Sequence, residues 1–200
     1  YLALGDSYTI GEGVDAADRW PVRLIERLRS DGIGTADAEI IARTGWTADR
    51  LAVQLNVAAP DGPFDLVTLM TGVNDQLRGL PVEGYRDELA ALLSEAVALA
   101  DGQPSNVIVV SIPDWGVTPF ASGRDRDRIA AEIDLFSQVN REEADRAGAR
   151  YVDVTPASRE TATDPSLLAA DGLHPSGLMY ARWVALIADP AHEVLTASGR

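Results

Sequence analysis

The chain has 200 residues, 46% of them hydrophobic, which is enough apolar material for one hydrophobic core. Its formal net charge is −14, and all seventeen basic residues are arginine, so phosphate backbones and anionic lipid surfaces would be repelled. The absence of cysteine excludes disulfides, thiolate zinc sites and a cysteine nucleophile. We therefore expect a single domain over residues 1–200, with no nucleic-acid partner.

No apolar run approaches the roughly 18 residues that a membrane-spanning helix needs. We expect a soluble protein without membrane insertion and assign it to the cytoplasm. Because Tyr1 is not a methionine and the apolar run begins at once, we also expect that a leader or a few residues have been removed before it.

The first element is a buried strand at Leu2–Leu4, which runs directly into Gly5-Asp6-Ser7. In open α/β sheets, ligands bind outside the carboxyl ends of the strands. A serine at that place is a candidate nucleophile, although Gly-Asp-Ser is also a common composition for a simple turn. A serine hydroxyl needs a neighbouring base, which the chain can supply only from His174 or His192.

Two helices and two strands follow in alternation. Apolar residues at helical spacing predict a helix over residues 19–29, and residues 39–42 form a short strand. The next turn contains Gly45, and Thr47 can cap the helix after it. An apolar run over residues 64–71 predicts a third strand that stops at Gly72-Val73-Asn74-Asp75.

The second half repeats this alternation. A helix over residues 84–100 precedes a strand over residues 106–112. The loop over residues 114–120 contains the apolar residues Trp115 and Phe120, which indicate that it forms either a lid or a pocket wall. The charged run over residues 124–128 is interpreted as the solvated side of a helix. A last strand over residues 149–154, an irregular stretch over 155–170 and a final helix complete the chain.

Strands that alternate with helix-length connections indicate an α/β fold with a parallel sheet of about five strands and helices on both faces. Before the final helix lies Asp171-Gly172-Leu173-His174-Pro175. In a non-helical turn, the Asp171 carboxylate can accept from one imidazole nitrogen and leave the other as a base. The alternatives are a turn-forming aspartate and a surface histidine. We expect His192 to be structural, because it lies in a tail that contains Pro190, after the last full helix.

Ester cleavage also needs donors for the oxyanion. The backbone N–H groups of Ser7 and Gly45 and the side-chain amide of Asn74 would all lie at strand ends on one edge of the sheet. A turn glycine and a turn asparagine are the alternatives for the last two.

Taken together, these motifs resemble those of the SGNH hydrolases, also called GDSL-like lipases and esterases, over nearly the whole chain. Gly5-Asp6-Ser7 matches the nucleophile block, Gly45 the second block, Gly72-Val73-Asn74-Asp75 the G-x-N-D block and Asp171-x-x-His174 the D-x-x-H block. The resemblance implies a three-layer α/β/α sandwich with a flavodoxin-like sheet, and a serine esterase with a shallow site and no metal or cofactor.

The resemblance also implies residue roles. The nucleophile would be Ser7, the base His174 and the orienting acid Asp171, with oxyanion donors at Ser7, Gly45 and Asn74. Asp6 and Asp75 are interpreted as supports for their turns. The chain departs from the family at Tyr8, where leucine is frequent, and this change concerns the pocket wall. The residues predicted to contact substrate are Tyr8, Val73, Trp115 and Phe120.

Several functions remain open at this point. Within the family, the chain could be a simple esterase, a carbohydrate O-deacetylase, or a lysophospholipase or thioesterase that accepts longer acyl groups at Trp115, Val117 and Phe120. Outside it, a flavodoxin-like binding module could cradle a phosphate at residues 7–13. The ordinary α/β-hydrolase fold is disfavoured because the chain has no Gly-x-Ser-x-Gly elbow.

Overall fold

The computed structural model describes residues 1–197. A sheet of five parallel strands, in the order β2-β1-β3-β4-β5, forms the middle layer. Its strands are β1 (Leu2–Gly5), β2 (Glu39–Ala42), β3 (Val67–Met70), β4 (Val107–Val110) and β5 (Arg150–Val152). This confirms the predicted α/β fold class and the three-layer α/β/α architecture.

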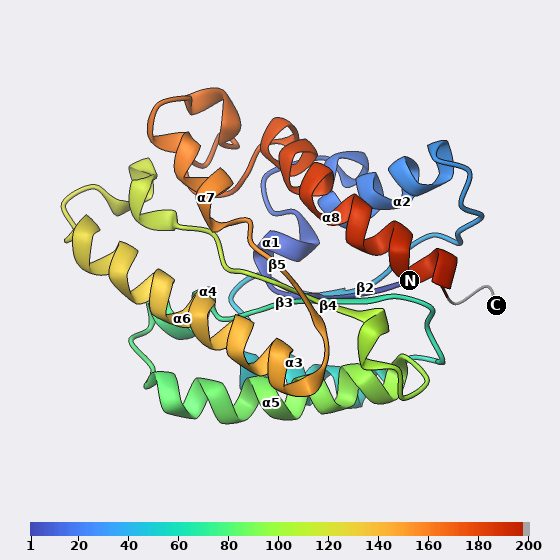
Figure 1. Ribbon diagram of the computed structural model, residues 1–200. Coiled ribbons are helices and arrows are strands. Elements are labelled where there is room, and N and C mark those ends of the chain that lie inside the picture. The colour runs from blue at the N-terminus through green and yellow to red at the C-terminus, as the bar shows by residue number, and fades with distance from the viewer. Residues whose placement is uncertain (198–200) are drawn as a thin grey trace.

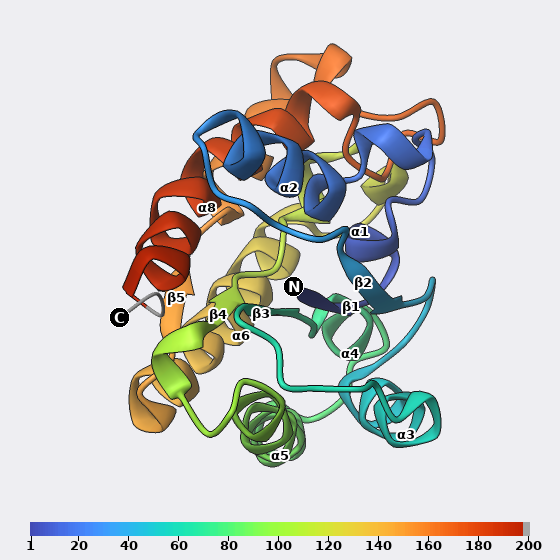
Figure 2. The ribbon, with the colours of Figure 1, turned by 90° about the vertical axis from the view of Figure 1, so that its right-hand side faces the viewer.

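Helices cover both faces of this sheet (Figures 1 and 2). One face carries α1 (Ser7–Ile10), α2 (Trp20–Ser30) and α8 (Gly177–Ala197), and the other carries α3 (Ala48–Ala58), α5 (Val82–Leu99) and α6 (Arg126–Ala147). Two shorter helices, α4 (Val73–Leu77) and α7 (Thr155–Ser158), follow β3 and β5. Parallel strands require helices on the faces of the sheet, because the chain must return along one face to the start of the next strand.

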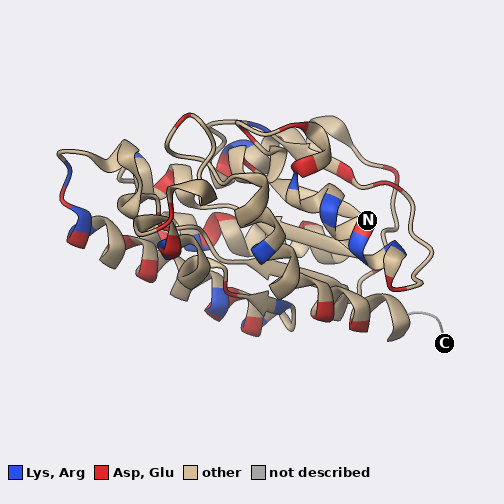
Figure 3. Ribbon diagram, turned by 90° about the horizontal axis from the view of Figure 1, so that it is seen from above, with Lys and Arg blue, Asp and Glu red and all other residues tan. Residues whose placement is uncertain are grey.

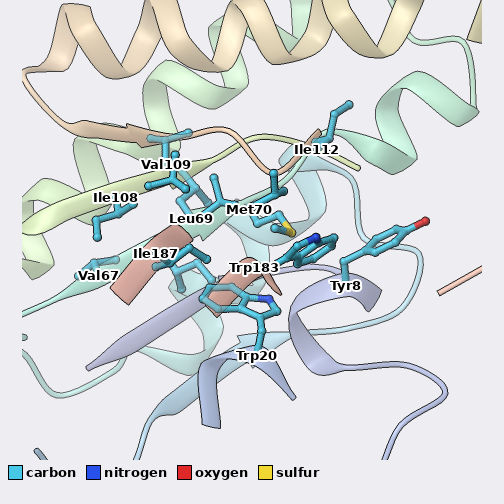
Figure 4. Packing of buried hydrophobic residues seen from close by; sticks show 14 of the residues in the cluster. Tyr8, Trp20, Val67, Leu69, Met70, Ile108, Val109, Ile112, Trp183 and Ile187 are labelled. Atoms are coloured by element: carbon cyan, nitrogen blue, oxygen red, sulfur yellow. The ribbon is translucent and has the colours of Figure 1, made fainter. Parts of the chain in front are cut away.

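The hydrophobic core lies on both sides of the strands. All four residues of each of β1, β3 and β4 are buried, as expected for strands covered on two faces. Between the sheet and the layer of α2 and α8, the buried indole ring of Trp183 lies beside Met70 of β3 and that of Trp20 lies near Ile187 of α8 (Figure 4). Charged residues of both signs alternate along the outer faces of the helices (Figure 3).

The position of β1 between β2 and β3 decides which turns lie beside Ser7. Gly5 pairs with Ala42 of β2 on one side and with Met70 of β3 on the other. A Cβ atom at Gly5 would lie 2.1 Å from the Thr9 hydroxyl and 2.7 Å from the Met70 carbonyl oxygen, so only glycine fits there. The turn after β1 is therefore flanked by the turns after β2 and β3.

Two local predictions in the last quarter of the chain were wrong. The stretch over residues 155–170 is not irregular, since it contains α7 and two 3-10 helices at Arg159–Ala162 and Pro165–Leu167. Helix α8 continues through Pro190, so His192 lies within a helix and not in a tail. The buried side chains of Ala191 and Val194 extend its apolar face beyond the proline, which compensates for one lost backbone hydrogen bond.

A further local difference concerns the start of α3. Thr47 occupies the cap position, but its side chain does not bond a backbone N–H there and instead donates to Asp49. The Ala48 N–H bonds the Asp75 carboxylate, so an acid from α4 replaces the expected cap. Within residues 1–197, no helix combines the length and the apolarity needed to cross a membrane.

Candidate active site

Ser7 is the first residue of α1, directly after the end of β1. The turn is sharp because Asp6, which is fully buried, accepts the N–H of Tyr8 at 3.0 Å and so caps the helix from inside the protein. Ser7 itself is only 5% exposed. The structure thus places this serine where the sequence predicted it, at the carboxyl edge of the sheet.

The second predicted pair, Asp171 and His174, forms a direct contact in the loop before α8. Asp171 Oδ2 lies 2.6 Å from His174 Nδ1, while Oδ1 accepts the backbone N–H groups of Leu173 and His174, each at 2.9 Å. The two interpretations drawn from the sequence, turn former and partner of the imidazole, therefore both apply, one to each oxygen. An Nδ1–H that donates to the carboxylate leaves Nε2 as the free acceptor of the ring.

Burial disfavours ionisation of Asp171, but the hydrogen bonds from His174 and from the two backbone N–H groups outweigh it, so its pKa lies below the ordinary value. The acid is therefore negatively charged at neutral pH. His174 is 7% exposed, so this charge lies against a mostly buried imidazole.

Tyr8 connects the two ends of the chain. Its ring centroid lies 5.0 Å from that of His174, and its carbonyl oxygen accepts the Tyr180 hydroxyl of α8 at 3.0 Å. Tyr8 follows Ser7 directly, so these contacts bring the N-terminal serine and the C-terminal histidine to the same edge of the sheet. In the described part of the chain the Ser7 hydroxyl has no hydrogen-bond partner, and no bond joins it to His174.

Asn74 joins the turns that follow the first three strands. Its Nδ2 donates to the Trp46 carbonyl at 2.9 Å and makes a longer contact of 3.3 Å with Asp6 Oδ2. Asp75 holds the start of α3 through the Ala48 N–H. Asp6 and Asp75 therefore support the turns through these hydrogen bonds, as predicted. Asn74 lies in the first turn of α4, and its side chain is half-buried.

Gly45 lies in the turn after β2 with a φ of +82°, in the left-handed region that favours glycine. The Arg78 guanidinium donates to the Gly45 carbonyl at 2.6 Å, a contact that the sequence analysis missed because nothing local links the two residues. Within residues 1–197, the backbone N–H groups of Ser7 and Gly45 have no hydrogen-bond partner, so both remain able to donate.

Two buried aspartates at this edge of the sheet have raised pKa values. Burial, with a further contribution from the neighbouring Asp75 charge, raises the pKa of Asp6 to about 7. Burial likewise raises the pKa of Asp75 to about 6. Both values lie far above those of exposed aspartates, so the protonation of this edge changes near neutral pH.

The predicted pocket residues have different surroundings. Tyr8 and Trp115 line a narrow pocket beside His174 whose free volume is about 10 Å³, close to the space of one water molecule. Phe120 is 42% exposed and packs edge-on against Trp115 at 5.8 Å between ring centroids. Val73 is 4% exposed and belongs to the core. The loop over residues 114–120 is thus folded onto the body as a wall.

The comparisons with known proteins agree with this architecture. TesA superposes with a TM-score of 0.75 at 22% identity, covering 96% of this chain and 98% of that one. A lipase/acylhydrolase from Enterococcus faecalis gives 0.71 at 23% identity, covering 96% and 94%. Axe2, an acetylxylan esterase from Geobacillus stearothermophilus, gives 0.68 at 20% identity, covering 97% and 92%. At these identities the likeness establishes the fold. No curated protein sequence matches the chain.

The fold is a three-layer sandwich with a serine directly after β1, an interior strand of the sheet. The model of the GDSL-like Lipase/Acylhydrolase family matches residues 3–182, and the chain belongs to that family. The resemblance drawn from the four motifs is therefore confirmed. The protein is a serine hydrolase that acts on ester bonds.

Proposed function

We propose that this protein hydrolyses short-chain carboxylic esters through an acyl-enzyme on Ser7, as a single catalytic domain. The observation that carries the proposal is the Asp171–His174 pair, whose imidazole packs on Tyr8, the residue after Ser7. His174 Nε2 takes the Ser7 proton while Oγ forms a bond to the ester carbonyl carbon. The same proton then passes to the departing alcohol as its C–O bond breaks.

Water completes the cycle. His174 accepts a proton from water as the water oxygen attacks the acyl carbon, and the proton then returns to Ser7 Oγ as the acid leaves. Asp171 orients the imidazole and stabilises its charged form in both steps. The N–H groups of Ser7 and Gly45, together with the Asn74 amide, stabilise the oxyanion of both tetrahedral intermediates.

The spaces around the site support a short acyl group. The pocket beside Tyr8 and His174 has room for about one water molecule, and the larger cleft beyond Trp115 is lined mostly by polar and charged side chains. Neither provides the long apolar wall that a fatty acyl chain needs. This favours acetyl esters, such as those of a carbohydrate, over the lysophospholipase or thioesterase alternative. The acetylxylan esterase among the solved structures acts on substrates of this kind.

The nucleophile is tested by covalent labelling. A para-nitrophenyl alkylphosphonate forms a bond between phosphorus and a serine oxygen and releases para-nitrophenolate, and mass spectrometry then locates the adduct. We expect the label on Ser7 and none on a folded Ser7→Ala variant. A label on another serine, with activity retained in Ser7→Ala, would disprove the assignment.

The base is tested with a matched pair of histidine variants. His174→Ala should lower kcat for para-nitrophenyl acetate by at least about a hundredfold, the lower end of the contribution of general acid–base catalysis. His192→Ala removes the other imidazole, which lies half-buried in α8 outside the loop that carries the pair, and should retain the parent rate. Equal rates in the two folded variants would rule out His174 as the base.

A further inference from the structure

A second, wider cleft of about 350 Å³ adjoins the proposed active site. Its walls are the end of α4 with the following turn and the beginning of α6, and Trp115 forms part of its lining. Arg78 links it to the catalytic edge, because its guanidinium contacts the Gly45 carbonyl and its backbone N–H bonds the Asn74 carbonyl at 3.2 Å. A group bound in this cleft would therefore lie next to the proposed oxyanion donors.

Charge is distributed unevenly in this cleft, which we call the arginine cleft after Arg78, Arg124 and Arg128. Its two acids already have partners: Glu132 accepts from Arg128 at 2.7 Å and from a glutamine at 2.8 Å, and Asp125 accepts a backbone N–H at the start of α6. Among the residues that the structure describes, Arg78 and Arg124 have no carboxylate partner. Two guanidinium groups without a carboxylate partner therefore line one cleft in a chain of net charge −14.

Both guanidinium groups are held in place without being neutralised. Arg124 lies over two aromatic rings, with Cζ 5.2 Å from the Trp115 centroid and 5.3 Å from that of Phe120. Arg78 is held by one carbonyl oxygen, which uses at most part of its five N–H donors. Such fixed groups lose little side-chain entropy when they bind an anion.

Residues 124–128 are all exposed, as expected for the solvated side of a helix, and residues 126–128 are the first residues of α6. Arg124 lies before α6, which begins at Arg126, in a loop where basic and acidic positions alternate (Figure 3). Arg124 is exposed, and its guanidinium lies over the Trp115 ring. The aromatic side chains of the preceding loop are what bring it to the cleft.

We propose that the arginine cleft binds an anionic group of the ester substrate, a carboxylate, sulfate, sulfonate or phosphate carried by either the acyl or the alcohol part. Planar guanidinium groups match the oxygen geometry of such anions and form charge-assisted hydrogen bonds to them. A strongly acidic protein repels anions at long range, so local arginines are required to retain one. This proposal rests on Ser7-dependent ester hydrolysis and specifies which esters are preferred.

Two substrate pairs test it, each of which compares an anionic ester with a neutral analogue of similar length. For the alcohol side, para-acetoxybenzenesulfonate is compared with para-acetoxybenzenesulfonamide. For the acyl side, the para-nitrophenyl ester of sulfobutanoic acid is compared with that of pentanoic acid. We expect the parent protein to prefer the anionic member of one pair through a lower KM, and added salt to reduce that preference. The pair that responds identifies the part of the substrate that enters the cleft.

Three variants distinguish the effect of the arginines in the cleft from the effect of the protein's net charge. Arg124→Gln and Arg78→Gln should each lower the anionic-to-neutral ratio of kcat/KM by about tenfold, the effect of losing one charge-assisted hydrogen bond. Arg50→Gln removes the same charge from an exposed position on α3 outside the cleft and should preserve the ratio. Both kcat/KM values in the ratio are measured on the same variant. A general loss of activity would lower both values equally and leave the ratio unchanged.

The failures are distinguishable. If the parent hydrolyses all four esters in a Ser7-dependent manner without preference for either anion, or if Arg50→Gln lowers the ratio as much as Arg124→Gln, the cleft does not bind the substrate. If none of the four esters is hydrolysed, the proposed esterase function itself is wrong.

Discussion

The side chain of Asn74 shows how single residues couple the fold to the proposed chemistry. An amide nitrogen carries two hydrogens, and here one is directed to the Trp46 carbonyl at 2.9 Å. The other makes only the long contact of 3.3 Å with Asp6, so it can turn to a stronger acceptor. An oxyanion that develops beside Ser7 is such an acceptor, whereas the neutral ester carbonyl is a weaker one.

Replacement of Asn74 should therefore affect the transition state more than substrate binding. We expect Asn74→Ala to lower kcat for para-nitrophenyl acetate by about a hundredfold or more, with KM little changed, because the lost donor interacts chiefly with the charge that forms during reaction. Steady-state kinetics on a variant with parent-like circular dichroism would check this. A rise in KM with unchanged kcat would instead show that Asn74 contributes only to ground-state binding.

At the scale of elements, the strands were predictable where branched apolar residues run together, as in Val67–Met70 and Val107–Val110. The Asp171–His174 contact was predictable too, because both residues lie in one short loop. The segment over residues 155–170 was not, since its short helical turns are stabilised by tertiary contacts that no local pattern reveals. The arginine cleft was missed for the same reason, because Arg78 and Arg124 are far apart in the sequence and line one cleft only after the chain has folded.

The start of α4 depends on one glycine. Gly72 has a φ of +117°, and a Cβ there would lie 2.7 to 2.8 Å from the Tyr85 hydroxyl group and ring. Tyr85 is buried and donates to the Thr71 carbonyl at 2.9 Å, so it has little freedom to move. Any side chain at Gly72 would thus displace either this tyrosine or the helix that carries Asn74.

We expect Gly72→Ala to lower the free energy of unfolding by about 1–3 kcal/mol, from the left-handed backbone and the contact with Tyr85 together. Gly32→Ala is the matched control, since Gly32 also has a positive φ, +89°, but a Cβ added there would have no other atom within 4 Å. Denaturant unfolding of both variants separates the two causes. Equal losses of stability would show that the contact with Tyr85 contributes nothing.

For the molecule as a whole, pH should act on stability through buried acids as well as through surface charge. Above neutral pH, the net charge of −14 makes the acidic groups repel one another. Asp6 and Asp75 add a second effect, since their pKa values in the folded protein are about 7 and about 6, against an ordinary value near 3.8. Because the folded state holds these protons more tightly, this contribution is complete below pH 3.8 and is lost as the pH rises toward 7.

Asp6→Asn isolates the larger of these shifts. The amide keeps the shape of the carboxylate and cannot ionise, so the decline in unfolding free energy between pH 4 and 7 should become shallower by up to about 4 kcal/mol, at about 1.4 kcal/mol per pKa unit. Asp87→Asn removes the same charge from the exposed face of α5 and should leave the slope near that of the parent. If urea unfolding across this range gave parallel curves for the parent and for Asp6→Asn, Asp6 would be ionised throughout. In that case the Asp6 carboxylate would be charged although it is buried. The hydrogen bonds that it accepts from the Tyr8 N–H and the Asn74 amide would then be sufficient to offset the cost of burying that charge.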